Sequence, residues 1–150
     1  MKFYVAYGSN LNLAQMANRC PDAKIIAKGV IEGYALKYRG SKTGSYATII
    51  KEDGKSVPVL IWKISDVDER KLDVYEGFPT FYYKKRMLVR LENGRRMYAM
   101  AYIMFDKAMP GIPSNYYVRT IYEGYLANDL DLNILFDSLD ENEREVKACR

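Results

Sequence analysis

The stretch Tyr7-Gly8-Ser9-Asn10-Leu11-Asn12 connects the first apolar run of the chain to its first helical pattern. Residues 3–7 are apolar and typical of a β-strand, whereas residues 13–19 are typical of a helix. Asn12 and Gln15 stand at the spacing of a helix capping box. The chain is therefore predicted to leave a strand, turn sharply and enter a helix through small polar residues.

A turn of this kind can bind an anionic group. Its backbone N–H groups point toward one place, and the start of the helix adds partial positive charge. Gly8 has no side chain that would block the close approach of a ligand. We expect a small site for a group such as a carboxylate, although a turn that only joins a strand to a helix would contain the same residues.

The composition indicates one soluble globular domain over residues 1–150. Of the residues, 49% are hydrophobic and 28% are charged, and the formal net charge is only +4. Lysine and arginine are scattered among aspartate and glutamate, which argues against a nucleic-acid-binding surface. We therefore expect a small-molecule partner and no nucleic acid.

Neither a targeting segment nor a membrane span is recognisable in the sequence. Lys2 leads directly into a short apolar run, and the longest uncharged apolar stretch is residues 97–105. A membrane helix needs about 20 apolar residues. Cys20 and Cys149 suit a reducing compartment, although a disulfide between them is left open. We expect a cytoplasmic protein without membrane association; a homodimer is compatible with the sequence.

Strand signals dominate the middle of the chain. Two pairs of strand-like segments flank glycine-containing turn signals: 46–50 and 57–64 around Asp53-Gly54, and 82–91 and 95–105 around Asn93-Gly94. Residues 25–38 predict one or two further strands, broken near Gly29 or Gly33. Residues 97–105 are apolar on both faces, which predicts a central strand.

Helices are inserted between these strands. Ser65 is placed to cap one helix that ends near Gly77, and Ser114 to cap another. A last helix is expected from about Asp131, with its charged tail, residues 140–150, fraying. The fold class predicted is α+β, with a mixed, largely antiparallel sheet curled into a small β-barrel and helices flanking it.

Missing residue types narrow the chemistry. The chain contains no histidine, which excludes a Ser-His-Asp triad and every histidine-ligated metal. Its two cysteines are far apart, and neither standard phosphate-binding glycine motif is present. We expect no metal and no cofactor, so proton transfer in an enzyme would depend on a carboxylate, a lysine or a tyrosine.

Glu76 is the best carboxylate candidate. It lies between a helix end and a turn, with aromatic neighbours that include Tyr75, Phe78 and Phe81. Burial among them would raise its pKa toward neutrality, and the partial negative charge of the helix C-terminus would act in the same direction. The alternative is an exposed glutamate at an ordinary helix end.

Two segments together resemble a known family. Tyr7-Gly8-Ser9-Asn10-Leu11 resembles the opening motif of the γ-glutamylcyclotransferases and their AIG2-like relatives. Residues 72–79, Leu-Asp-Val-Tyr-Glu-Gly-Phe-Pro, resemble the second motif of that family, whose glutamate is the catalytic acid/base. The resemblance implies a γ-glutamylcyclotransferase-like barrel with Glu76 as the catalytic residue and residues 7–11 as part of the substrate-binding site.

A third segment and one ambiguity complete the resemblance. Pro113-Ser114 followed by Tyr117 is similar to the family segment that contributes a substrate-facing tyrosine. One branch of the family has a small residue two positions before its second-motif tyrosine, where this chain has Phe81 before Tyr83. The AIG2-like pattern instead places that tyrosine at Tyr82. The resemblance therefore implies Tyr117 and either Tyr82 or Tyr83 as substrate-binding residues.

The reaction implied is an intramolecular cyclisation. The α-amine of a γ-glutamyl group attacks its own γ-carbonyl, and 5-oxoproline forms as an amino acid or amine leaves. Ring closure needs positioning and proton transfer but no protein nucleophile. Two alternatives remain: a small-molecule binder that uses the same pocket without catalysis, and a nucleic-acid binder that uses Lys84-Lys85-Arg86 and Arg95-Arg96. Alternation of the first cluster across a strand argues against a single basic face.

Overall fold

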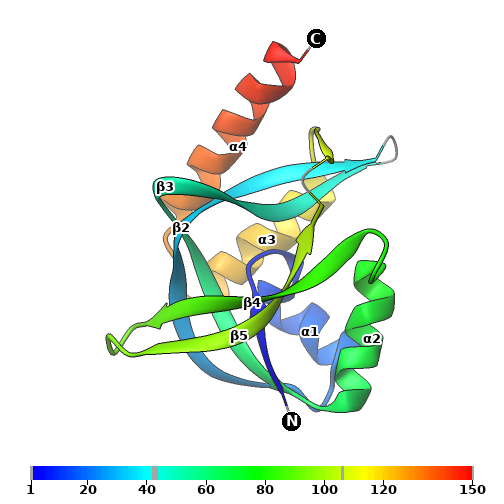
Figure 1. Ribbon diagram of the computed structural model, residues 1–150, viewed down its shortest axis with the longest axis vertical. Coiled ribbons are helices and arrows are strands. Elements are labelled where there is room, and N and C mark those ends of the chain that lie inside the picture. Colours follow the sequence, from blue (N-terminus) through cyan, green and yellow to red (C-terminus); the bar gives the residue numbers. More distant parts are fainter. Residues whose placement is uncertain (1, 42–43, 106, 150) are drawn as a thin grey trace.

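Two long strands dominate the sheet in the computed structural model, which describes residues 2–41, 44–105 and 107–149. They are β2 (Lys24–Ser41) and β3 (Gly44–Ile64), which pair antiparallel along most of their length (Figure 1). The other strands are β1 (Lys2–Ala6), β4 (Tyr82–Leu91), β5 (Arg96–Met104) and the short β6 (Met109–Pro110).

The first five strands form a closed barrel. Their order is β3-β1-β5-β4-β2, and the additional pairing of β2 with β3 closes the ring. β1 and β5 are parallel, whereas the other neighbouring strands pair antiparallel. The mixed, largely antiparallel barrel predicted from the sequence is thus confirmed.

The prediction of a hairpin turn at Asp53-Gly54 is wrong. β3 runs continuously through these residues, and the register with β2 shifts from Glu32↔Ser56 to Tyr34↔Lys51. Gly54 has φ 84° and Gly33, opposite it, has φ 78°. Positive φ serves a β-bulge as well as a hairpin turn, so the glycine signal does not distinguish a bend from a chain reversal. Residues 25–38 accordingly lie within one strand.

The second predicted hairpin is confirmed. β4 and β5 pair in register up to Arg90↔Arg96, and the Leu91 N–H donates a 2.8 Å hydrogen bond to the Arg95 carbonyl. Gly94 supplies the positive φ of 84° that this tight loop requires. β5 lies between β1 and β4, as expected of a central strand.

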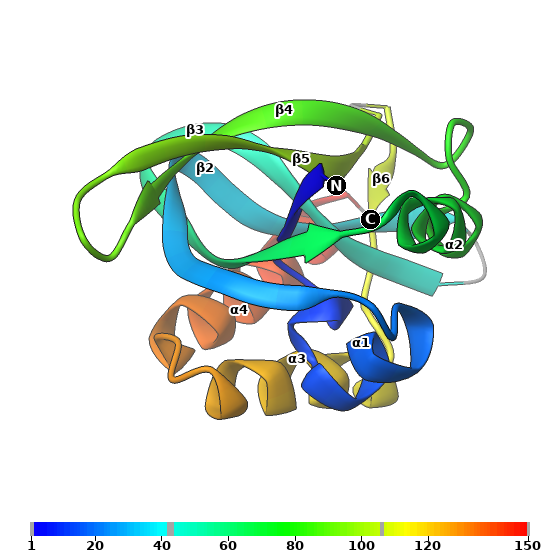
Figure 2. The same cartoon turned by 90° about the horizontal axis from the view of Figure 1, so that it is seen from below.

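Local capping residues determine where the helices begin. The helices are η1 (Ser9–Leu11), α1 (Leu13–Arg19), α2 (Asp66–Glu76), α3 (Asn115–Ala127) and α4 (Leu132–Ala148). The side chains of Ser65 and Ser114 accept hydrogen bonds from backbone N–H groups of the helices that follow them, as predicted. Asp131, where the last helix was expected to begin, caps α4 in the same way. Figure 2 shows α1, α3 and α4 on one side of the barrel and α2 at its edge.

The C-terminal tail does not fray as expected. α4 continues to Ala148, and its charged residues contact the long β2–β3 hairpin. Glu145 binds Lys37 at 3.0 Å and Arg39 at 2.8 Å, and Glu141 binds Lys55 at 2.7 Å. The basic partners lie 86 to 108 residues earlier in the chain, so no local pattern revealed them.

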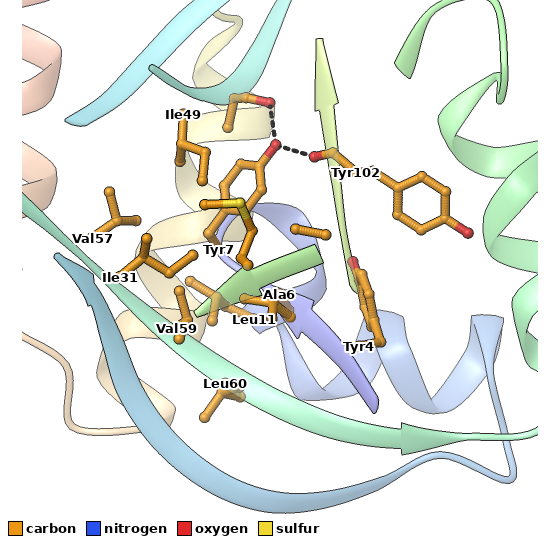
Figure 3. Packing of buried hydrophobic residues seen from close by; sticks show 14 of the residues in the cluster. Tyr4, Ala6, Tyr7, Leu11, Ile31, Ile49, Val57, Val59, Leu60 and Tyr102 are labelled. Carbon is orange, nitrogen blue, oxygen red and sulfur yellow. Dashed lines mark hydrogen bonds between the residues drawn. The ribbon is translucent and has the colours of Figure 1, made fainter. Parts of the chain in front are cut away.

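The barrel interior is apolar, and it continues under α3. Figure 3 shows Tyr7 packed beside Ile49, with its hydroxyl directed toward backbone oxygen atoms. Leu11 is fully buried, and a Cβ on Gly124 of α3 would lie 2.7 Å from its backbone. This close approach fixes the turn after β1 against α3.

Two further findings concern possible membrane spans and the cysteines. None of the helices in the described ranges is long and apolar enough to cross a membrane. Cys20 is buried, Cys149 is exposed, and both are free thiols.

Candidate active site

One cavity brings together the turn after β1, the C-terminal end of α2 and the start of α3. Its volume is about 320 Å³. The residues proposed from the sequence that line it are Tyr7, Gly8, Ser9, Asn10, Glu76, Tyr82 and Tyr117. These residues come from segments up to 110 positions apart, and the fold places them around one volume.

Two residues proposed from the sequence lie outside this cavity. Leu11 is fully buried below α3 and contributes to the core instead. The ring of Tyr83 packs at a centroid distance of 4.9 Å from that of Phe105. Successive side chains of a strand point to opposite faces, so only Tyr82 of the two neighbouring tyrosines reaches the cavity.

Three tyrosine hydroxyls meet at the backbone of Ala47. Tyr82 donates a 2.8 Å hydrogen bond to the Ala47 carbonyl, and Tyr7 donates to the carbonyls of Tyr102 at 2.5 Å and Ala47 at 3.5 Å. Tyr117 differs because its hydroxyl oxygen accepts a 3.0 Å hydrogen bond from the Ala47 N–H. The hydroxyl proton of Tyr117 therefore remains available to a ligand.

These hydroxyls stay protonated at neutral pH. Burial raises the pKa of Tyr7, Tyr82 and Tyr117 above its ordinary value, and the Glu76 carboxylate raises each of them further. Neutral phenols can donate hydrogen bonds to a substrate oxygen. They cannot act as bases under these conditions.

The turn after β1 leaves backbone donors at the cavity. Ser9–Leu11 form one turn of 3-10 helix, in which the Leu11 N–H bonds to the Gly8 carbonyl at 3.0 Å. Within the described residues no side chain caps the start of this turn, so the N–H groups of Ser9 and Asn10 remain available to a ligand.

Space beside Gly8 is limited. A Cβ at this position would lie 3.2 Å from the Ala47 Cβ and 3.4 Å from the Tyr117 hydroxyl. The absence of a side chain at Gly8 therefore keeps this part of the cavity open.

Glu76 is the carboxylate of the cavity. It is the last residue of α2, and Gly77 ends the helix in the left-handed conformation with φ 66°, as predicted. Burial raises the pKa of Glu76 from 4.5 to about 7, and Arg19 opposes this rise. A carboxyl group with a pKa near neutrality can both accept and return a proton.

Arg19 is a neighbour that the sequence reasoning did not identify, and Tyr75 was expected only as an aromatic neighbour of Glu76. The guanidinium carbon of Arg19 lies 3.5 Å from the centroid of the Tyr75 ring, and Arg19 donates a hydrogen bond to the side-chain oxygen of Asn10. The Tyr75 hydroxyl is 3.0 Å from Ser9 Oγ. Asn10 in turn donates to the Tyr4 hydroxyl at 2.9 Å. These contacts tie α1 and α2 to the turn.

A second network, which begins at the cavity-lining residue Tyr102, holds α2 against the barrel. The Tyr102 hydroxyl donates a 2.5 Å hydrogen bond to Asp73, and Lys84 lies 2.9 Å from Asp73 and 3.0 Å from Glu69. Lys84 thus belongs to a partly buried ion-pair network. Only the paired strands bring these residues to α2, so no sequence motif marks them.

The groups that line the cavity are of the kinds that transfer protons to and from a small molecule. It combines a carboxyl group with a pKa near 7, neutral phenol hydroxyls and available backbone N–H groups. Within residues 2–41, 44–105 and 107–149, no three acidic or cysteine side chains come together in a way that could hold a metal ion.

Comparison with known proteins identifies similar chains. Residues 4–119 match the family model described as gamma-glutamyl cyclotransferase, AIG2-like. The human Gamma-glutamylcyclotransferase is 29% identical over 138 residues, covering 86% of this chain and 72% of that protein. The bovine protein of the same name is 27% identical over 156 residues, covering 97% and 82%. A solved structure of a gamma-glutamyl cyclotransferase has a TM-score of 0.81 and 26% identity, covering 91% of this chain and 85% of its own.

Proposed function

Because the chain belongs to the AIG2-like gamma-glutamyl cyclotransferase family, we propose that it forms 5-oxoproline from a γ-glutamyl amino acid or γ-glutamyl amine. The observation that carries this proposal is the position of Glu76. Its carboxyl group lines the cavity and has a pKa of about 7, opposite an uncapped turn and neutral tyrosines. A site that only binds has no need of a group that can transfer protons at neutral pH.

The proposed reaction proceeds within one substrate molecule. The α-amine nitrogen attacks the γ-carbonyl carbon, and a new C–N bond closes the five-membered lactam. The original C–N bond then breaks, and the amino acid or amine leaves. Glu76 accepts the proton that the attacking nitrogen loses and returns one to the leaving nitrogen. Atoms and protons balance without an external reactant.

The other cavity residues would position the substrate. The N–H groups of Ser9 and Asn10 are available to bind the α-carboxylate or the oxygen that becomes negative in the transition state. Tyr117 has a hydroxyl proton to donate, and Tyr82 forms a wall of the cavity beside it. Folding the γ-glutamyl chain into a near-attack shape would contribute much of the acceleration.

The test is a direct assay for the product. The protein is incubated with a panel of γ-glutamyl amino acids and γ-glutamyl amines, and 5-oxoproline is quantified. Glu76→Gln keeps the size of the side chain but cannot transfer protons, so we expect kcat to fall by about 10²–10⁴-fold. Substrate affinity should survive, because the backbone turn rather than Glu76 binds the α-carboxylate.

Glu143→Gln is the matched control, because Glu143 is exposed on α4 and does not line the cavity. Its kcat should equal that of the wild-type protein. Binding of γ-glutamyl compounds without any 5-oxoproline would instead identify a small-molecule binder. Near wild-type turnover by Glu76→Gln would exclude Glu76 as the acid/base.

A further inference from the structure

The cavity has a buried end and an open end. Around the turn after β1, Tyr7 is 6% exposed and Asn10 2% exposed, whereas Tyr46 and Tyr75 are 39% and 44% exposed. All four residues line the same cavity. A substrate whose γ-glutamyl group occupied the buried end would therefore extend its leaving group toward Tyr46 and Tyr75.

Edge-to-face contacts hold the rings on one side of the open end. The Tyr46 ring lies 5.3 Å from that of Tyr117 at 88°, and 6.1 Å from that of Phe81 at 85°. Phe81 lies 5.2 Å from Tyr82 at 76°. Since Tyr117 and Tyr82 are hydrogen-bonded to Ala47, the two outer rings pack against a fixed inner pair.

The Tyr75 ring is fixed in a different way. The guanidinium carbon of Arg19 lies 3.5 Å from the centroid of the Tyr75 ring. The Tyr75 hydroxyl is 3.0 Å from Ser9 Oγ. The neighbouring Val74 also lines the cavity and is 83% exposed. Apolar side chains left exposed around a cavity opening are a feature of ligand-binding sites.

We propose that Tyr46, Tyr75 and Phe81 form a leaving-group subsite that selects substrates with an apolar, ring-bearing leaving group. The proposal rests on the proposed function, because that function places the γ-glutamyl group at the buried end. A ring that enters this subsite would gain edge-to-face contacts with side chains that are already ordered, so little conformational entropy would be lost on binding. A leaving group whose side chain is only a methyl would leave the three aromatic rings of the subsite exposed to water.

The test compares two substrates that differ only in the ring. The second-order constant kcat/KM is measured for γ-glutamyl-phenylalanine and γ-glutamyl-alanine with the wild-type protein, Tyr46→Ala and Tyr75→Ala. The wild-type protein should prefer the phenylalanine compound by about tenfold or more, the low end of discrimination by apolar pockets. Each substitution should reduce that preference to about twofold, because it removes one wall of the subsite.

Tyr98→Ala is the matched control. Tyr98 is 50% exposed on β5 and does not line the cavity, so its removal should leave the preference for the ring unchanged. Thermal unfolding of each variant checks that the fold is retained. Tyr46 lies in β3 and Tyr75 in α2, so if one of the two variants misfolds, the other still tests the subsite.

The outcomes separate this proposal from the proposed function. Equal kcat/KM for the two compounds, or an undiminished preference in both variants, overturns the subsite while the cyclisation stands. If neither compound yields 5-oxoproline, titration calorimetry with the same two compounds decides. Binding that is about tenfold tighter for the phenylalanine compound supports the subsite, although the proposed cyclisation is then wrong. Equal binding of the two compounds, or no binding, overturns both the subsite and the proposed cyclisation.

Discussion

The hydroxyl oxygen of Tyr117 accepts a 3.0 Å hydrogen bond from the backbone N–H of Ala47. The first residue lies in α3 and the second in β3, so this bond joins a helix to the barrel wall at the cavity. Because the oxygen is the acceptor, the hydroxyl proton points elsewhere and can reach a ligand. Tyr117 therefore has a structural role, and in the proposed reaction it also has a hydroxyl proton to donate to the substrate.

Replacing Tyr117 should affect both roles. Tyr117→Phe leaves the buried Ala47 N–H without its acceptor, so the free energy of unfolding should fall by about 1–3 kcal/mol. Loss of the donor should also raise KM for a γ-glutamyl substrate. Denaturant unfolding and steady-state kinetics measure the two effects. Tyr116→Phe, on the exposed face of the same helix, should change neither value, and unaltered kinetics in Tyr117→Phe would limit that residue to packing.

A side chain at Gly8 should close the part of the cavity that we propose binds the substrate's α-carboxylate. The Cβ would contact Ala47 at 3.2 Å and the Tyr117 hydroxyl at 3.4 Å. Gly8→Val should therefore abolish binding and turnover, and Gly8→Ala should weaken both to a smaller extent. Calorimetric binding and circular dichroism separate a blocked site from a lost fold. Normal turnover by Gly8→Val would place the pocket elsewhere.

The pH dependence of catalysis should reflect the Glu76 carboxyl group. If its basic form starts the reaction, kcat/KM should decrease below about pH 7, where the group becomes protonated. An unperturbed glutamate would give the same decrease near pH 4.5. The pH–rate profile of the wild-type protein measures the midpoint, and a midpoint near 4.5 would contradict the environment described for Glu76.

Protein stability should depend on the same group with a defined sign. The pKa of Glu76 is about 7 in the folded protein and 4.5 is its ordinary value, so the folded state binds the proton more tightly. The contribution of Glu76 to stability therefore becomes less favourable as pH rises from 4.5 to 7 and stays unfavourable above 7.

Glu76→Gln removes this term. The variant should be more stable than the wild-type protein at pH 8, and the difference should vanish near pH 4. Denaturant midpoints at the two pH values test this, and a constant difference between the proteins would argue against a raised pKa.

The ion pairs of α4 should contribute measurably to stability. Glu145→Ala removes contacts to Lys37 and Arg39, and the free energy of unfolding should fall by about 0.5–1 kcal/mol. Glu143→Ala, an exposed change on the same helix, is the control and should have about half that effect or less. Denaturant unfolding at low salt measures both variants. An equal loss of unfolding free energy in the two variants would mean that these ion pairs do not stabilise the packing of α4.

Local signals predicted where helices α2, α3 and α4 begin, where α2 ends, and one of the two hairpin turns. Ser65 and Gly77 bound α2 through hydrogen bonds to residues within four positions, so their neighbours suffice to predict them. The same is true of Asn93-Gly94. Asp53-Gly54 carried an equally strong local signal, but the partner strand bends with it at Gly33 and converts the expected turn into a bulge.

The sequence by itself determined the class of fold, the turn at Gly8 and Glu76 as the acidic candidate, because each depends on residue types and on neighbours a few positions away. Only the tertiary structure decided that Tyr82 rather than Tyr83 lines the cavity, since strand register sets which face points inward. It also placed Arg19 on Tyr75 and Tyr46 beside Tyr117. Contacts that span 56 to 71 residues come from barrel closure and helix packing, which no local propensity encodes.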